Sequence, residues 1–542
     1  MRRTSLVASL VVLAFASPAA AETFQVGPSK VHKDLQAVQG LLKPGDVVEV
    51  DGDATYPGGV YIRAAQSGTA GQKVTIRGVK VNGKRPVISG GGAGVLDGLG
   101  MVLNGSHYVL ESLEVTASTN TCVIHKGDDI TIRDFVVHDC PGHGLLGHDD
   151  EAGSLVLELS EFYKNGNGTF QHQIYMATGQ EMYPGSVFRM QHCYVHDGNG
   201  GNNVKSRSER NEIYANWIEG AYYHGLELIG PDKSPATPAR EDSDVVGNVI
   251  VGNGSQKWHL VRVGGDKDEA DTSGRYRFVN NTFVVGSQGN ASIVRLMLRI
   301  DTVEMHNNAF VQLGAGAAPV FATSEVAWIA GTTLFGSNNW VQSGVTGAPA
   351  SWTGTLTGGD PGLTNLAQLD LRPKEGSALL DKGASGPASV TDRPFPKPLS
   401  SPAFVPPSRQ LAAAASPRPA GGTLDIGAYE LGTGVPPGPG GTDAGTSSSG
   451  GASSSSGGAS SSSSGAGSAS SGGSSSGIGG GQDGGPGANG AAAEDGGCGC
   501  GLVGTHGSGA LAAAATTAML VLVGLRRQRR TRSRDSTGVD RS

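Results

Sequence analysis

Five short segments repeat one pattern and decide the fold of this chain: EIYANWI (212–218), DVVGNVI (244–250), RFVNNTF (277–283), EMHNNAF (304–310) and FGSNNWV (335–341). In each segment a short stretch leads into Asn, and a second, mostly apolar stretch follows. Val, Ile, Phe and Trp favour strands, whereas Gly and Asn favour tight turns. Each segment therefore predicts two short strands joined at the Asn.

The same pattern recurs in weaker form toward the N-terminus, in YVLESLEV, ITIRDFVV, LVLELSEF and FRMQHCYV. Matching positions lie 21 to 33 residues apart along the series. A period of this length, with β-rich segments and no long helical pattern between them, indicates a parallel β-helix of stacked coils. We expect a structural column in which Asn adopts left-handed backbone and hydrogen-bonds to its copy in the next coil. The column comprises Leu113, Asp134, Ser160, His192, Asn216, Asn248, Asn281, Asn308 and Asn339.

Composition divides the chain into four regions. Residues 1–21 combine two arginines, an apolar run and an Ala-rich end, which is typical of a secretory signal peptide. Residues 22–431 carry the repeat. Residues 432–497 are almost entirely Gly, Ser and Ala, a composition that cannot bury a core and predicts a disordered linker. Residues 498–542 hold a mostly apolar run at about 502–525 and then an Arg-rich end, which predicts a transmembrane segment.

The two ends of the repeat region carry segments that differ from the coils. DLQAVQGLL (34–42) predicts a short amphipathic helix that caps the open end of the β-helix and shields its strand edges. At the other end, residues 360–384 and 424–430 are expected to close the coil. The Pro-rich stretch 394–419 is expected to form a surface loop between them.

Charge and cysteine content narrow the class of protein. The formal net charge is −7, to which the Arg-rich end contributes +5 and the leader +2, so the rest of the chain carries about −14 and its body is net acidic. A net acidic body argues against nucleic-acid binding, and it requires any site for a polyanion to be locally basic. Cys122 and Cys140 have the option of pairing in an oxidising exterior, and Cys193 is expected in the core.

A polar column is predicted on one outer wall. The segments HQIYMA (172–177), NNVKSR (202–207), HGLELI (224–229), HLVRVG (259–264) and SIVRLM (292–297) supply one strand to each coil. With their apolar residues inward, alternate positions point outward, and stacking brings these positions about 4.8 Å apart. A long sugar chain fits along such a stripe; a solvated sheet face with ordinary charged ladders is the alternative. The outward residues are Tyr175, Lys205, Glu227, Arg262 and Arg295, joined by Arg207, while His172, Asn202 and His224 begin their strands on the same side.

Two stretches resemble known families. The run from QHQIY through NNVKSRSERNEIYANWI to RFVNNTFVV resembles secreted right-handed β-helix proteins of the pectate-lyase-like superfamily, and its NVKS strand is similar to that of alginate and chondroitin lyases. That resemblance implies Lys205 as the catalytic base with an arginine on the next coil, but here the next coil supplies Glu227. The sequence GGCGCG, the apolar run and the arginine cluster resemble the myxobacterial C-terminal sorting tail, which implies anchoring at the cell surface through Cys498 or Cys500.

The chemistry of β-elimination on a uronate assigns possible roles. The C5 proton is weakly acidic, so cations or Ca²⁺ must neutralise the adjacent carboxylate while a base removes the proton. Lys205 is the preferred base. If Glu227 instead keeps Lys205 charged, Lys205 becomes the neutralising cation. The base is then His172, His224 or Tyr175, and Arg207 is a further catalytic candidate.

The sequence thus predicts an exported, surface-anchored, monomeric polysaccharide lyase that acts on an acidic, uronate-containing polysaccharide. The alternatives are a glycosidase or uronate epimerase, and a non-catalytic polysaccharide-binding protein or adhesin. A glycosidase needs two carboxylates, and the column supplies only Glu227. Hard oxygen ligands suit Ca²⁺, and two acidic loops offer them. The candidate ligands are Asp149, Asp150 and Glu151 in one loop and Asp266, Asp268 and Glu269 in the other.

Overall fold

The computed structural model describes residues 20–91, 98–149, 151–231, 239–255, 257–266, 272–323, 333–391, 395 and 397–434. The chain divides into two compact units, Met1–Gly497 and Cys498–Ser542, and every described residue belongs to the first. The predicted transmembrane segment, the sorting residues Cys498 and Cys500, and nearly all of the predicted signal peptide and linker lie outside the described residues. Within those ranges, no helix is long and apolar enough to span a membrane.

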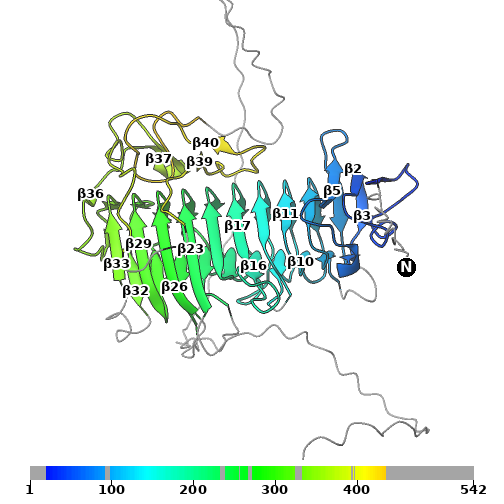
Figure 1. Ribbon diagram of the computed structural model, residues 1–542. Coiled ribbons are helices and arrows are strands. Elements are labelled where there is room, and N and C mark those ends of the chain that lie inside the picture. Colours follow the sequence, from blue (N-terminus) through cyan, green and yellow to red (C-terminus); the bar gives the residue numbers. More distant parts are fainter. Residues whose placement is uncertain are drawn as a thin grey trace, which may run out of the picture. The chain divides into compact units, whose positions relative to one another are not determined.

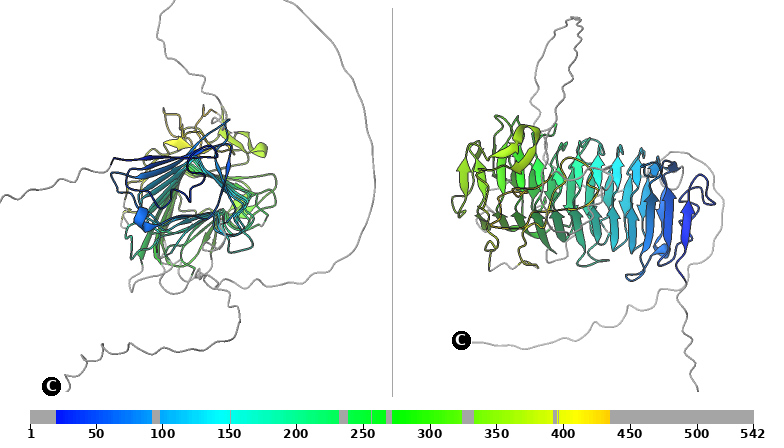
Figure 2. Two further views of the ribbon diagram at one scale, coloured as in Figure 1. Left: turned by 90° about the vertical axis from the view of Figure 1, so that its right-hand side faces the viewer. Right: turned by 90° about the horizontal axis from the view of Figure 1, so that it is seen from above.

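Three long parallel sheets form the walls of a β-helix (Figure 1). The chain passes from the first sheet to the second and then to the third in each coil, and the next coil pairs on top in parallel register. Seen along the axis of the coils, the three walls enclose one interior (Figure 2). The predicted all-β parallel β-helix is therefore confirmed.

The strands of the three walls are short. The first sheet contains β1 (Thr23–Val26), β2 (Val47–Asp51), β5 (Val74–Val79), β8 (Tyr108–Glu111), β11 (Ile130–Arg133), β14 (Leu155–Glu158), β17 (Val187–Gln191), β20 (Arg210–Tyr214), β23 (Ala239–Val246), β26 (Thr272–Val279), β29 (Ile300–His306) and β33 (Thr333–Ser337). The second contains β3 (Thr55–Pro57), β6 (Val87–Ser89), β9 (Glu114–Thr116), β12 (Val136–His138), β15 (Glu161–Tyr163), β18 (Tyr194–His196), β21 (Trp217–Ile218), β24 (Val249–Val251), β27 (Thr282–Val285), β30 (Ala309–Gln312), β34 (Trp340–Gln342) and β36 (Leu356–Gly358). The third contains β4 (Val60–Ile62), β7 (Met101–Leu103), β10 (Val123–His125), β13 (Leu145–Gly147), β16 (Ile174–Ala177), β19 (Val204–Arg207), β22 (Leu226–Leu228), β25 (Val261–Val263), β28 (Val294–Leu296) and β32 (Phe321–Thr323). Smaller elements are the pairs β31 (Ala318–Pro319) with β35 (Val345–Thr346), β37 (Leu363–Asn365) with β38 (Asp370–Pro373) and β39 (Phe404–Val405) with β40 (Ser416–Pro417), and the 3₁₀ turns η1 (Ala64–Gln66) and η3 (Leu366–Gln368).

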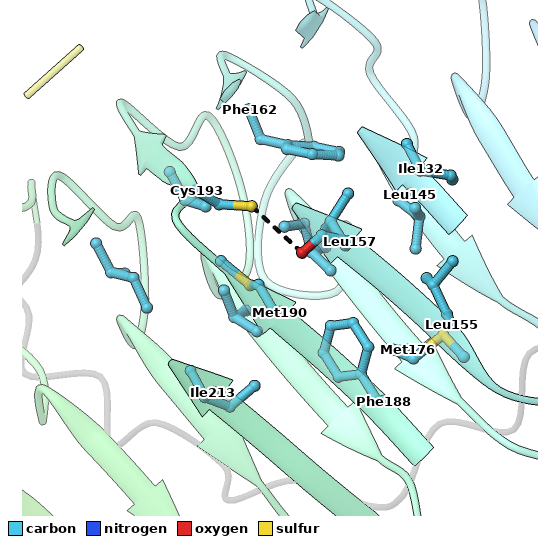
Figure 3. Close-up of a cluster of buried hydrophobic side chains, with 14 of the residues drawn as sticks. Ile132, Leu145, Leu155, Leu157, Phe162, Met176, Phe188, Met190, Cys193 and Ile213 are labelled. Atoms are coloured by element: carbon cyan, nitrogen blue, oxygen red, sulfur yellow. Dashed lines mark hydrogen bonds between the residues drawn. The ribbon is translucent and has the colours of Figure 1, made fainter. Parts of the chain in front are cut away.

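Apolar side chains point inward at alternate strand positions and fill the interior. On β17, Phe188 and Met190 lie in the core, and the residues between and beside them face outward. Figure 3 shows these two side chains packed against Leu155 and Leu157 of the preceding coil. Because the side-chain period of a strand is two, stacking in register turns each inward position into a continuous apolar column.

An Asn ladder runs through the turns between the first and second sheets. Asn248 Oδ1 accepts hydrogen bonds from the backbone N (2.8 Å) and the side-chain Nδ2 (3.0 Å) of Asn216. The same two bonds join Asn248 to Asn281, Asn281 to Asn308 and Asn308 to Asn339. The predicted hydrogen-bonded ladder is confirmed for these five residues.

Two details of the predicted ladder are wrong. The left-handed backbone belongs to the residue before the ladder position, as at Asn280 with φ 52°, and not to the ladder Asn itself. Asp134 and His192 belong to this left-handed column, with φ 51° and 58°. The ladder positions of their coils are the next residues, since the backbone N of Phe135 donates to Ser160 Oγ and that of Cys193 to Asn216 Oδ1.

The N-terminal segment 34–42 forms successive turns, so the predicted helix is wrong. Gln39 N donates to Leu35 O at 2.9 Å, but no regular helical ladder continues through this described segment. Nine residues ended by a Lys-Pro pair offer too few helical bonds to offset the cost of starting a helix. Leu35, Val38 and Leu42 are nevertheless buried in the core, as expected of a segment that covers the first coils.

The segment after the last coil packs along the outer side of the second sheet, where it does not close the coil as predicted. β37 and β38 pair in antiparallel fashion beside the coils (Figure 1). Leu363, Leu371 and Tyr429 share an apolar cluster with Trp217 and Trp340 of the second sheet. This segment shields the outward-facing apolar residues of that wall from solvent.

The Pro-rich stretch lies at the surface but is fastened to the coils. The centroid of the Phe395 ring lies 3.7 Å from the guanidinium carbon of Arg277 in the first sheet. Arg409 Nε lies 2.7 Å from Glu219 Oε1 at the end of the second sheet. The stretch therefore packs against two walls of the β-helix.

The structure shows the pairing state of the three cysteines in the described region. Cys122 and Cys140 form a disulfide that joins residues 18 positions apart. Cys193 is a buried free thiol, as expected for a core residue, and its Sγ lies 3.6 Å from Leu157 O (Figure 3).

Candidate functional site

The predicted polar column is present on the third sheet. The residues on either side of each column position point into the core, which fixes the register of the column. Three cations and one carboxylate give the column a formal charge of +2, although the body as a whole is acidic. In order, the column consists of Tyr175 on β16, Lys205 on β19, Glu227 on β22, Arg262 on β25 and Arg295 on β28.

The column faces outward, but most of its side chains are buried. Tyr175, Glu227 and Arg262 are 3%, 2% and 5% exposed. Lys205 and Arg295 are half-buried, and Lys205 Nζ lies 5.1 Å from the centroid of the Tyr175 ring, within cation–π range. The predicted register is confirmed, and ionic and ring contacts with neighbouring residues bury these side chains, which argues against the alternative of a solvated sheet face.

Glu227 is the centre of this ionic network. Its Oε1 lies 2.9 Å from Arg262 Nη1, and its Oε2 lies 3.7 Å from Lys205 Nζ and accepts a 2.5 Å hydrogen bond from Asn202 Nδ2. Burial on its own raises the pKa of a carboxyl group, but the Arg262 and Lys205 cations hold the pKa of Glu227 well below its usual range. Glu227 is therefore an ionised partner for two cations and is no source of protons.

Imidazoles form a second column at the start of these strands. His143 Nδ1 accepts a hydrogen bond from His172 N at 2.9 Å, and His172 Nδ1 accepts one from Asn202 N at 2.8 Å. Because both Nδ1 atoms accept an N–H, the neutral rings carry their proton on Nε2. Burial lowers the pKa of His143 to about 4 and that of His172 well below its usual value, so both rings stay neutral near pH 7.

His224 carries its proton on the other ring nitrogen. Its Nδ1 lies 3.1 Å from the carbonyl oxygen of His259, and a carbonyl only accepts, so Nδ1 is protonated and Nε2 has a lone pair. That Nε2 is buried and has no hydrogen-bond partner among the described residues. Burial lowers the pKa of His224 to about 3, so the ring is neutral. His224 thus keeps Nε2 as an unprotonated ring nitrogen.

Two aromatic rings border His224. The centroid of Tyr223 lies 4.1 Å from that of His224, and Trp258 meets Tyr223 edge-on at 4.6 Å. Both Tyr223 and Trp258 are half-buried, so they cover the imidazole while presenting part of their surface to solvent.

Arg207 and Asp266 form an ion pair beside the column. Arg207 Nη2 lies 2.8 Å from Asp266 Oδ2, and Arg207 is 1% exposed. Asp266 also lies 4.0 Å from Arg262. Asp266, a candidate calcium ligand from the sequence, is thus placed between two guanidinium groups, and Arg207 is directed toward it.

Sequence reasoning missed two members of the imidazole column, His143 and His259. Each lies two residues before the first residue of its third-sheet strand, at the same offset as His172 and His224. His259 Nδ1 lies 2.6 Å from Ser292 Oγ of the next coil. The repeated offset is the signal in the sequence that identifies them.

The remaining metal candidates are only partly described. Glu151 Oε2 lies 2.5 Å from Lys126 Nζ and 3.5 Å from His148 Nδ1. Within the described ranges, no group of three or more His, Cys, Asp or Glu side chains is arranged to hold a metal ion. A role for Ca²⁺ stays a prediction. Asp149 is half-buried, while Asp150, Asp268 and Glu269 lie outside the described residues.

No protein-family model matches the chain, and a search of curated proteins gives no match. Among solved structures, the chain is similar to pectate lyase Pel9A, with 14% identity, a TM-score of 0.47, and coverage of 76% of this chain and 97% of that one. It is also similar to an alginate lyase from Paenibacillus sp. str. FPU-7, with 16% identity, a TM-score of 0.33, and coverage of 62% and 98%. A third similar structure is the GH136 lacto-N-biosidase from Eubacterium ramulus, with 12% identity, a TM-score of 0.33, and coverage of 58% and 66%. Similarity at this level identifies no activity for this chain.

Proposed function

We propose that the third-sheet column binds an acidic polysaccharide and cleaves it by β-elimination. The observation that carries this proposal is the charge of +2 on one column of a body that is otherwise net negative. A uronate chain is a row of carboxylates, and a row of cations one coil apart is complementary to it.

Lys205 is proposed as the cation that neutralises the substrate carboxylate. Its Nζ lies 3.7 Å from the ionised carboxylate of Glu227, so Lys205 already faces one carboxylate in the unbound chain. The Arg207 guanidinium pairs with Asp266. This arrangement favours the second of the two roles open to Lys205 over the role of base.

His224 is proposed as the group that accepts the C5 proton. The C5–H bond breaks, its electron pair forms the C4=C5 double bond, and the C4–O bond to the leaving sugar breaks, with a proton passing to the leaving oxygen. His172 cannot accept at Nδ1, which is already bonded to Asn202, but its Nε2–H can donate. Because His224 is fully buried in this unbound form, we expect Tyr223 to move when substrate binds.

A non-catalytic polysaccharide-binding protein is the second candidate. The specific observation that favours it is the burial of His172, Asn202 and His224, which leaves Lys205 and Arg295 as the accessible members of the site. A glycosidase is less well supported, because Glu227 is ionised and a glycosidase requires a protonated carboxyl group as its acid.

The test uses the purified full-length chain with alginate, pectate, chondroitin sulfate and heparin. Elimination creates a double bond conjugated with the carboxylate, so it appears as a rise in ultraviolet absorbance, whereas hydrolysis gives reducing ends without that rise. The variants are Lys205→Arg, Lys205→Ala and His224→Ala, with Lys164→Ala, an exposed lysine on a different wall, as the matched control.

If Lys205 is the neutralising cation, Lys205→Arg keeps a substantial part of the activity while Lys205→Ala loses it. If Lys205 is the base, both variants are equally inactive, because arginine does not give up its proton. Loss of a proton acceptor at His224 is expected to lower kcat by about 100-fold or more. An unchanged kcat in His224→Ala would remove His224 from the mechanism, and polymer binding without any product would favour the non-catalytic candidate.

We also propose that the chain is exported and held at the cell surface through Cys498 or Cys500, as a monomer. The sequence features that support this are the leader, the Gly/Ser-rich linker and the Arg-rich end. Fractionation of cells expressing the full chain and a Cys498→Ser, Cys500→Ser double variant tests the proposal; surface retention of the double variant would contradict it.

A further inference from the structure

A pocket of about 190 Å³ lies on the second sheet, where the C-terminal segment meets β21. Trp217 and Tyr429 form its buried part, with 1% and 2% exposure, and Leu371 lines it as well. Gln368 and Arg409 are exposed at its mouth. The third-sheet column occupies a different wall, so the pocket is separate from the site proposed above.

The charged groups around this pocket cancel. Arg372 donates to both oxygens of Asp370, from Nε at 2.7 Å and from Nη2 at 2.6 Å. Arg409 Nε donates to Glu219 Oε1 at 2.7 Å. Two guanidinium groups and two carboxylates leave no net charge, in contrast to the +2 of the third-sheet column. The pocket therefore offers hydrogen-bond donors and acceptors with no electrostatic preference for an anion.

Trp217, one of the lining residues, carries a buried indole donor. Its Nε1 has no hydrogen-bond partner among the described residues, and the side chain is 1% exposed. Buried donors are nearly always paired, by protein, water or ligand.

We propose that this pocket binds one neutral pyranose ring. Its volume is below the roughly 300 Å³ at which pockets for larger ligands begin, which limits the ligand to about a single ring. The carbon-bound face of a pyranose matches the apolar part of the lining, Trp217 and Leu371. Its hydroxyl groups both donate and accept, which matches the mixed carboxylate and guanidinium groups around the mouth. The pocket thus gives the protein a second carbohydrate site that needs no acidic sugar.

The indole N–H resonance of Trp217 reports directly on the pocket. The chain has five tryptophans, so a ¹H–¹⁵N spectrum of the full chain contains five indole signals, and Trp217→Phe identifies the relevant one by its loss. The probes are D-glucose, D-galactose, D-mannose and D-xylose, with D-glucuronate for comparison. The proposal expects at least one neutral sugar to shift this signal in a saturable manner, with D-glucuronate shifting it less.

A pocket-filling variant controls for effects elsewhere. Ser408→Phe places a ring in the pocket lining and is expected to abolish the saturable shift, while the exposed Ala403→Phe, outside the lining, leaves it intact. Ser408 is half-buried and Ala403 is exposed, so neither substitution is expected to unfold the chain. The proposal is overturned if no neutral sugar shifts the Trp217 signal, if only D-glucuronate does, or if Ser408→Phe shifts it as the unchanged chain does.

Discussion

Replacing Glu241 by Gln tests the electrostatics inside the β-helix. Glu241 is fully buried, with Oε2 accepting a 2.6 Å hydrogen bond from the Tyr276 hydroxyl and Oε1 accepting bonds from Ser243 Oγ (3.1 Å) and Asn211 Nδ2 (3.2 Å). Burial raises the pKa of Glu241 to about 8 from an ordinary 4.5, against the hydrogen bonds from Tyr276 and Ser243, which lower it. Near pH 7 the carboxyl is therefore protonated in the folded chain and ionised in the unfolded chain.

The sign and size of the effect follow from that difference. Because the folded pKa is the higher one, the stabilisation from Glu241 is complete below the unfolded pKa of 4.5 and is lost as the pH rises through about 8. At about 1.4 kcal/mol per pKa unit, the loss reaches a few kcal/mol, with an upper limit of about 5 kcal/mol above pH 8. Gln has a similar shape and keeps partners for its amide, but it does not ionise.

The measurement is the free energy of urea unfolding of the unchanged chain and Glu241→Gln, between about pH 5 and pH 8. We expect the variant to gain stability relative to the unchanged chain by about 1 kcal/mol per pH unit across this range. Glu49→Gln is the control, since hydrogen bonds from Arg77 and Gln25 lower the pKa of Glu49, and its contribution is lost only at lower pH. Parallel curves for Glu241→Gln and the unchanged chain would refute a protonated Glu241.

Three further changes probe the ladder, the disulfide and the column. Asn281→Ala removes acceptor and donor atoms from the Asn ladder and is expected to lower the free energy of urea unfolding by about 2–4 kcal/mol. The exposed Asn199→Ala is the control and is expected to lower it by less than about 0.5 kcal/mol. Equal losses in the two variants would contradict a ladder that stabilises the fold. Replacing Cys122 and Cys140 together by Ala is expected to cost about 3 kcal/mol and to lower the thermal midpoint without reductant; no change in that midpoint would contradict it. Glu227→Gln raises the column charge from +2 to +3. It is expected to tighten binding of an acidic polysaccharide and to make that binding more dependent on salt, as measured by calorimetry at two ionic strengths. Weaker binding would place Glu227 in direct contact with the sugar.

The coil architecture could be predicted because its signals are local and repeated. A strand period of two decides which residues of each segment face inward, and the Asn-containing turns fix the length of a coil. The errors at Asp134 and His192 arise where the turn holds a polar residue just before an apolar or small ladder position. Sequence shows that a polar residue is present, but only the backbone shows which neighbour is left-handed.

The C-terminal return could not be predicted from the repeat, because Trp217 lies more than a hundred positions before the residues that cover it. Trp217 and Trp340 occupy outward positions on the second sheet, where a solvated wall carries polar side chains. Two outward tryptophans on one wall are therefore a signal of a cover. The C-terminal segment that covers them has no sequence periodicity that links it to that wall. It contributes Leu363, Leu371 and Tyr429.

For the third-sheet column, the sequence predicts which residues are neighbours, but not which other charged groups surround them. Stacking alone places Lys205 beside Glu227, and the sequence is sufficient for that step. The role proposed for Lys205 rests on its surroundings, which include a contact that the sequence does not show: the Arg207 guanidinium pairs with Asp266, 59 residues further along the chain. Glu227 pairs with Lys205 and Arg262. Under the function proposed above, a substrate carboxylate competes with Glu227 for the Lys205 ammonium group. That proposal favours a polymer with many carboxylates, because each one that displaces part of the network is followed by another one coil further along.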